Sequence, residues 1–120
     1  MSKIALVVRQ DFSVETLDVA EDFLGKMQNA VDGLIQPLDL IPNLTLWVNE
    51  EFLLRNDLGV NIFASIVYQE CFRTPTLLLG DAVFTGGVDA EGDTQGLTEG
   101  MVAHLTKWAT ALKESALESA

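Results

Sequence analysis

The chain has 120 residues, of which 48% are hydrophobic, and its formal net charge is −11. This length and apolar content are typical of one domain with a packed core, and they exclude a disordered chain. The excess of acids disfavours binding to bare nucleic acid or to an anionic membrane, because long-range repulsion would oppose it. We expect a single domain over residues 1–120.

The chain begins with a predicted hairpin followed by a helix. Ile4–Arg9 is β-rich, and Ser13–Leu17 alternates and can return beside it. Helical spacing then predicts a helix over Val19–Asp32, with Asp18 as its N-cap and Gly33 as the left-handed residue that ends it. The apolar stripe of this helix consists of Phe23, Leu24, Met27, Ala30, Val31 and Leu34.

Two further strands are predicted in the middle of the chain. Leu34–Leu40 alternates, and Pro37 within it favours the edge of a sheet. Leu44–Asn49 is a strong strand pattern with an apolar face and a second face that carries Trp47. Glu50–Arg55 is expected to turn and to continue as a short strand.

The second half of the chain carries less regular patterns. Val60–Cys71 fits a short helix, although its β-branched residues leave a strand open. Thr76–Thr85 is predicted to be a long strand interrupted at Gly80-Asp81 by a bulge or a tight turn. Gly86–Gly96 is predicted to be a loop.

The last element is a predicted helix over Leu97–Leu112, which carries an apolar stripe, with Thr98 able to cap it. The tail Glu114–Ala120 is expected to fray. The order β-β-α-β-β-α-β-α indicates an α+β fold with a mixed, mostly antiparallel sheet. The two amphipathic helices, over Val19–Asp32 and Leu97–Leu112, are expected to pack on that sheet.

Few side chains in this sequence can carry out catalysis. Cys71 and His104 are the sole cysteine and histidine. They could form a nucleophile–base pair, but no third group that would orient the histidine is evident. One cysteine excludes an internal disulfide, and no secretion signal opens the chain, so we expect a cytoplasmic protein. We predict no catalytic residue, no metal and no cofactor.

An acidic loop superficially suggests a calcium site. Its carboxylates alternate at Asp89, Glu91 and Asp93, but the loop lacks the glycine and the final glutamate of an EF-hand. We expect a solvated acidic loop without a bound metal.

Five residues are candidates for binding: Trp47, Asn49, Glu50, Asn61 and Asp81. Trp47 is an aromatic anchor if one sheet face is open, and a core residue if helices cover both faces. Asn49 is either a turn-former or part of a polar recognition spot. A ligand site would require Asn49, Glu50, Asn61 and Asp81 to converge in one pocket.

Four short motifs occur in order along the middle of the chain, at residues 27–36, 48–51, 61–64 and 80–86. The first motif is Met-Gln-Asn-Ala-Val-Asp-Gly-Leu-Ile-Gln, followed by Val-Asn-Glu-Glu, Asn-Ile-Phe-Ala and Gly-Asp-Ala-Val-Phe-Thr-Gly. With them, Gln28–Gly87 resembles a family of small uncharacterised phage, plasmid and metagenome proteins, a domain of unknown function. Phe52 stands where that family usually has Gly. The resemblance implies a mobile-element origin and no particular activity.

Three functions remain open at this point. The first is a non-catalytic interaction module that binds a protein partner or a second copy of itself. The second is an acidic, DNA-mimicking inhibitor, with Asp18, Glu21, Asp22 and Asp32 on the exposed side of the first helix. The third is a small-ligand binder or an enzyme with an unfamiliar site.

Overall fold

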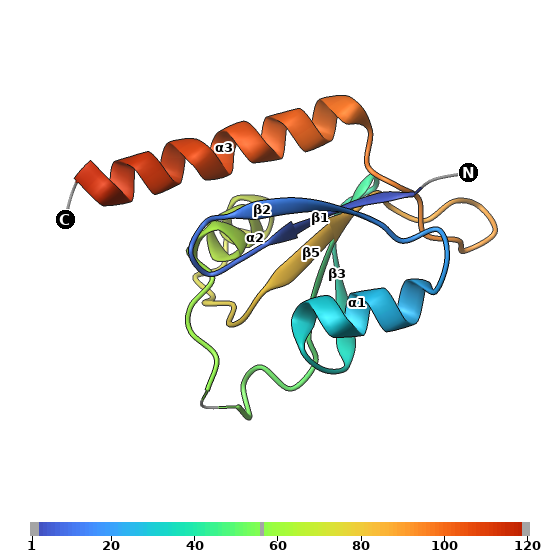
Figure 1. Ribbon diagram of the computed structural model, residues 1–120, viewed down its shortest axis with the longest axis horizontal. Coiled ribbons are helices and arrows are strands. Elements are labelled where there is room, and N and C mark those ends of the chain that lie inside the picture. The colour runs from blue at the N-terminus through green and yellow to red at the C-terminus, as the bar shows by residue number, and fades with distance from the viewer. Residues whose placement is uncertain (1–2, 56, 119–120) are drawn as a thin grey trace.

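The computed structural model describes residues 3–55 and 57–118, with side chains as far as residue 116. In this part of the chain the α+β class and the predicted element order are confirmed (Figure 1). The elements are β1 (Ile4–Val8), β2 (Val14–Asp18), α1 (Phe23–Val31), β3 (Ile35–Ile41), β4 (Leu44–Asn49), α2 (Ile62–Phe72), β5 (Ala82–Thr85) and α3 (Glu99–Glu118).

The strands form a five-stranded sheet in the order β2-β1-β5-β4-β3. Every neighbouring pair is antiparallel, so the sheet is more uniform than the mixed one that we expected. The central position of β5 explains its complete burial. The two edges are β2 and β3, and β3 carries Pro37 and a register shift between Asp39 and Ile41, which confirms its predicted edge position.

Helices cover both faces of the sheet, as Figure 1 shows with α3 on one side and α1 on the other. On one face, side chains such as Leu6, Leu46 and Phe84 pack against α2 and α3 in a single buried cluster. On the other face, Val7 and Val83 pack with residues of α1 in a second cluster. This division follows from the alternation of side chains along each strand.

The first helix begins later than predicted, at Phe23 rather than at Val19. The hairpin continues to Val19, whose N–H donates to the Lys3 carbonyl at 2.8 Å, and that pairing holds the segment extended. Asp22 is therefore the cap and accepts from the Gly25 N–H. Leu24 was placed in the apolar stripe, but its side chain is 56% exposed.

The left-handed position at the end of α1 belongs to Asp32, with φ 60°, rather than to Gly33. Gly33 has a different constraint, because a Cβ there would lie 2.6 Å from the Asn49 side-chain nitrogen.

Two predicted strand segments lie outside the sheet. Residues 50–54 form only a turn, closed by hydrogen bonds such as Leu54 N–H to Glu51 carbonyl. The segment before β5 bonds instead to α2 and its approach: the Leu78 N–H donates to Ser65 Oγ, and the Leu78 carbonyl accepts from the Asn61 N–H. The Gly80-Asp81 interruption is a bend, with Gly80 at φ 86°.

Two other predictions for the second half agree with the structure. The helix alternative for Val60–Cys71 is correct, as α2 shows. Thr98 caps α3, since its Oγ1 accepts from the Met101 N–H at 3.1 Å. However, α3 continues to Glu118, so residues 114–118 are helical rather than frayed, and 119–120 lie outside the described residues.

Candidate functional site

Asn49 has a structural role in the fold. Its side chain is 1% exposed and makes three hydrogen bonds. The amide nitrogen donates to the carbonyls of Val31 and Asp32, both at 3.1 Å, and the oxygen accepts from the Glu51 N–H at 2.8 Å. Asn49 therefore joins the end of α1 to the turn that follows β4.

Asn61 has a corresponding role on the opposite face. It is 0% exposed, and its oxygen caps α2 by accepting from the Ala64 N–H at 3.1 Å. Its nitrogen donates to the carbonyls of Val8 at 3.1 Å and Gly80 at 2.9 Å. One buried amide thus connects α2, the end of β1 and the entry to β5.

Trp47 packs on the face covered by α1. Its ring meets Phe23 edge-on at a centroid distance of 5.5 Å, and its indole N–H donates to Thr85 Oγ1 at 2.8 Å. Because α1 covers this face and Trp47 is half-buried there, most of its ring packs within the chain.

The remaining two candidates lie near chain turns. Glu50 is exposed, and Asp81 accepts from the Gln10 N–H at 3.2 Å. Asn49 and Asn61 serve helices on opposite faces of the sheet, so the structure does not bring the four polar candidates into one shared pocket. Within the described residues, moreover, no buried side-chain nitrogen or oxygen lacks a hydrogen-bond partner.

Cys71 and His104 lie on different helices and are both exposed. Partial desolvation, and then the neighbouring Glu70 carboxylate, raise the pKa of the Cys71 thiol, so the thiol stays protonated at neutral pH. His104 lies beside Trp108 on α3, with ring centroids 6.1 Å apart. These surroundings do not activate a nucleophile.

The acidic loop is organised by its own hydrogen bonds. The carboxylate oxygens of Asp89, Glu91 and Asp93 lie within 4.8 Å of one another, and all three residues are exposed. Asp89 accepts from the backbone N–H groups of Glu91 and Asp93 and from the Gln95 amide. Its oxygens therefore shape the turn.

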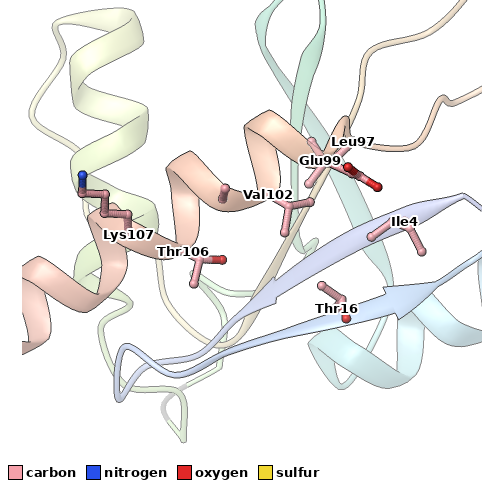
Figure 2. A pocket seen from close by; sticks show the side chains of 8 residues that line it. Ile4, Thr16, Leu97, Glu99, Val102, Thr106 and Lys107 are labelled. Carbon is pink, nitrogen blue, oxygen red and sulfur yellow. The ribbon is translucent and has the colours of Figure 1, made fainter.

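An apolar groove lies between β2 and α3, as Figure 2 shows, with a volume of about 660 Å³. We call it the β2–α3 groove. It is lined by Ile4, Thr16, Leu97, Glu99, Val102, Ala103, Thr106 and Lys107.

The position of α3 creates this groove. The Leu97 N–H donates to the Ile4 carbonyl at 2.8 Å, which fixes the start of the helix beside the start of β1. Leu105 and Ala109 are buried in the core below α3. Thr16 of β2 and Ala103 of α3 stay exposed, so the helix leaves the middle of the outer strand uncovered on this face, while Val14 nearer the hairpin turn is partly buried against the core.

The outer edge of β2 has no partner strand in the described residues, although its Asp18 carbonyl accepts from Lys26 Nζ at 2.7 Å. The hairpin closes with the Arg9 N–H donating to the Ser13 carbonyl, and Val19 donates to Lys3. In an antiparallel ladder, alternate residues bond inward. With this register, the backbone groups of Val14, Thr16 and Asp18 point away from β1. The opposite edge differs, because Pro37 and the bulge interrupt β3.

Sequence reasoning missed this groove. The groove depends on where α3 lies across the sheet, which no local pattern encodes. Two weak sequence features could have indicated it. Ala103 and Thr106 lie beside the apolar stripe of α3, and the β2 segment contains neither proline nor lysine.

In the described residues, the fold and its surfaces define an α+β domain with helices on both faces of the sheet and an uninterrupted edge strand at β2. A family model described as a domain of unknown function (DUF3846) matches residues 1–110, so the chain belongs to that family. Comparison with curated proteins and with solved structures gave no match. None of the helices in the described residues is both long enough and apolar enough to cross a membrane.

Proposed function

We propose that this protein is a non-catalytic protein-interaction module and that it binds its partner at the β2–α3 groove. The observation that carries the proposal is the coincidence of an apolar groove with the unpaired edge of β2. A protein segment placed there can take up backbone hydrogen bonds from the strand and bury apolar side chains in the groove.

The chemistry of the groove supports a protein partner over a small polar ligand. Ile4, Leu97 and Val102 supply apolar surface, and Thr16 and Thr106 supply only hydroxyls. The two charged side chains, Glu99 and Lys107, have opposite signs. An apolar centre with a polar rim is the usual anatomy of a protein interface.

Site-specific photo-crosslinking tests this proposal. A benzophenone amino acid at Ala103 is expected to form a covalent adduct with a protein, either another chain or a second copy. The matched control is Ala111, which is exposed on the same helix and is not part of the groove lining. No protein adduct at Ala103, or equal adducts at both positions, would contradict the proposal.

A DNA-mimicking inhibitor is a second candidate, favoured by the net charge of −11 and by the exposure of Glu21, Asp22 and Asp32. We rank it lower because Arg55 pairs with Asp32 at 3.0 Å. A complex with a nucleic-acid-binding enzyme that dissociates steeply with added salt would support it.

The resemblance of Gln28–Gly87 to phage and plasmid proteins supports a further part of the proposal, a mobile-element origin. Phage or plasmid genes on both sides of the coding sequence are the expected finding. A chromosomal setting in which every flanking gene is a housekeeping gene would count against it.

A further inference from the structure

We infer that the occupant of the β2–α3 groove is a second copy of this chain, related by a two-fold axis that passes beside Thr16 and Ala103. This inference rests on the proposed function and names its partner. In the dimer the two β2 strands pair antiparallel, and the two α3 helices face each other across the axis.

The strand register is self-complementary. The outward-facing residues of β2 are Val14, Thr16 and Asp18, and Thr16 is the middle residue of the strand. An axis at Thr16 places it opposite its own copy and places Val14 opposite Asp18 of the other copy. Each of these positions has its backbone donor and acceptor directed outward, so each pair can exchange two hydrogen bonds. The Asp18 carbonyl also accepts from Lys26 Nζ at 2.7 Å, so in the dimer it shares or releases that contact.

The same axis keeps like charges apart. Asp18 faces a valine rather than another aspartate. Glu15, on the opposite face of the strand, faces Leu17 of the other copy and is already paired with Arg9 at 2.6 Å. Like charges directly opposite each other would destabilise a strand pair, and this register contains none.

The helix carries a matching pattern of charge. Glu99 lies four residues before Ala103, and Lys107 lies four residues after it, and all three residues line the groove. When two copies of α3 run antiparallel about Ala103, each Glu99 lies opposite the Lys107 of the other copy. The small side chain of Ala103 at the centre permits the helices to approach.

The other edge of the sheet does not offer this arrangement. At β3, Pro37 removes a backbone donor and the bulge at Asp39/Ile41 breaks the regular ladder. A closed two-fold dimer therefore uses β2, and it extends the sheet without leaving an open β2 edge.

Sedimentation velocity on the intact chain tests the dimer. The wild type is expected to show a monomer–dimer equilibrium at protein concentrations below about 500 µM. Lys107→Glu places like charges opposite each other and is expected to weaken association roughly tenfold. The double variant Glu99→Lys/Lys107→Glu reverses both charges and is expected to restore it. Lys113→Glu makes the same charge change outside the groove and should leave the dimer intact.

A second variant tests the strand pairing. Thr16→Pro removes an outward N–H that β1 does not use, and edge strands tolerate proline. It is expected to abolish the dimer while the thermal transition of the monomer persists.

The outcomes separate the two proposals. A wild type that stays monomeric throughout this range overturns the dimer, and if Ala103 still crosslinks to a different protein, the proposed function survives. A dimer that is insensitive to both Lys107→Glu and Thr16→Pro uses another surface and overturns the inference.

Discussion

At the scale of single residues, two buried asparagines have structural roles, although the sequence is equally compatible with a role in binding. Asn49 and Asn61 each satisfy three backbone groups. Both belong to motifs that carried the family resemblance. Their amides are therefore accounted for by helix ends and strand ends, and a ligand is not required to explain them.

Substitution of Asn61 tests that structural role. Asn61→Ala leaves the Val8 and Gly80 carbonyls without their donor and removes the cap of α2, so we expect a loss of about 3 kcal/mol in the free energy of unfolding. Asn61→Asp keeps the cap acceptor but places a charge at a site that is 0% exposed, and it should cost more at neutral pH. Urea unfolding measures both, and two near-neutral variants would contradict the role.

The acid dependence of stability has an identifiable contributor in Asp18. Hydrogen bonds from the backbone N–H groups of Ala20 and then Lys3 lower the pKa of Asp18 below its usual value of 3.8. A lowered folded-state pKa stabilises the fold above pH 3.8, and this contribution is lost as the pH falls through the folded-state pKa.

We therefore expect Asp18→Asn to be less stable than the wild type near neutral pH and to approach it in strong acid. Thermal unfolding as a function of pH, at low protein concentration, measures the difference. A constant difference at all pH values would show that the charge of Asp18 is not the cause.

At the scale of elements, the sequence predicted what depends on local patterns. Alternation identified Leu44–Asn49 and its two faces, Pro37 identified an edge, and Thr98 identified the start of α3. The start of α1 could not be predicted in this way, because Asp18 and Asp22 are both good caps. The choice is made by the pairing of Val19 with Lys3, which is a non-local contact.

The same limit explains the other differences. Thr76–Leu79 has strand character, but Ser65 and Asn61 take its backbone hydrogen bonds. The groove likewise depends on how α3 lies over β1. Where the competing partners are distant in the sequence, local propensity does not decide the outcome.

The loop after β5 supplies an element-scale prediction. A Cβ on Gly87 would lie 1.9 Å from the Pro42 carbonyl oxygen, a backbone atom with little freedom. We expect Gly87→Ala to lower the unfolding free energy by about 3 kcal/mol. Gly100 is the matched control, because a Cβ there meets nothing within 4 Å and alanine in a helix is favoured by about 1 kcal/mol. Equal effects in chemical denaturation would contradict this account of the loop.

At the scale of the whole molecule, the net charge of −11 opposes self-association. Two such chains repel over long range, while the exposed Glu99–Lys107 pairs contribute little. Because added salt screens the repulsion, we expect the dimer to strengthen between about 20 and 300 mM NaCl. A dimer that weakens over this range would mean that the local pairs outweigh the net charge.

The whole account depends on the outer edge of β2 as a surface that binds protein. Amide hydrogen exchange at Val14, Thr16 and Asp18, followed by NMR at low and high protein concentration, tests it most directly. We expect these outward N–H groups to exchange freely in the monomer and to become protected as concentration rises. If these three amides stay unprotected at every concentration, while the amides of Glu15 and Leu17 remain protected by β1, the account is contradicted.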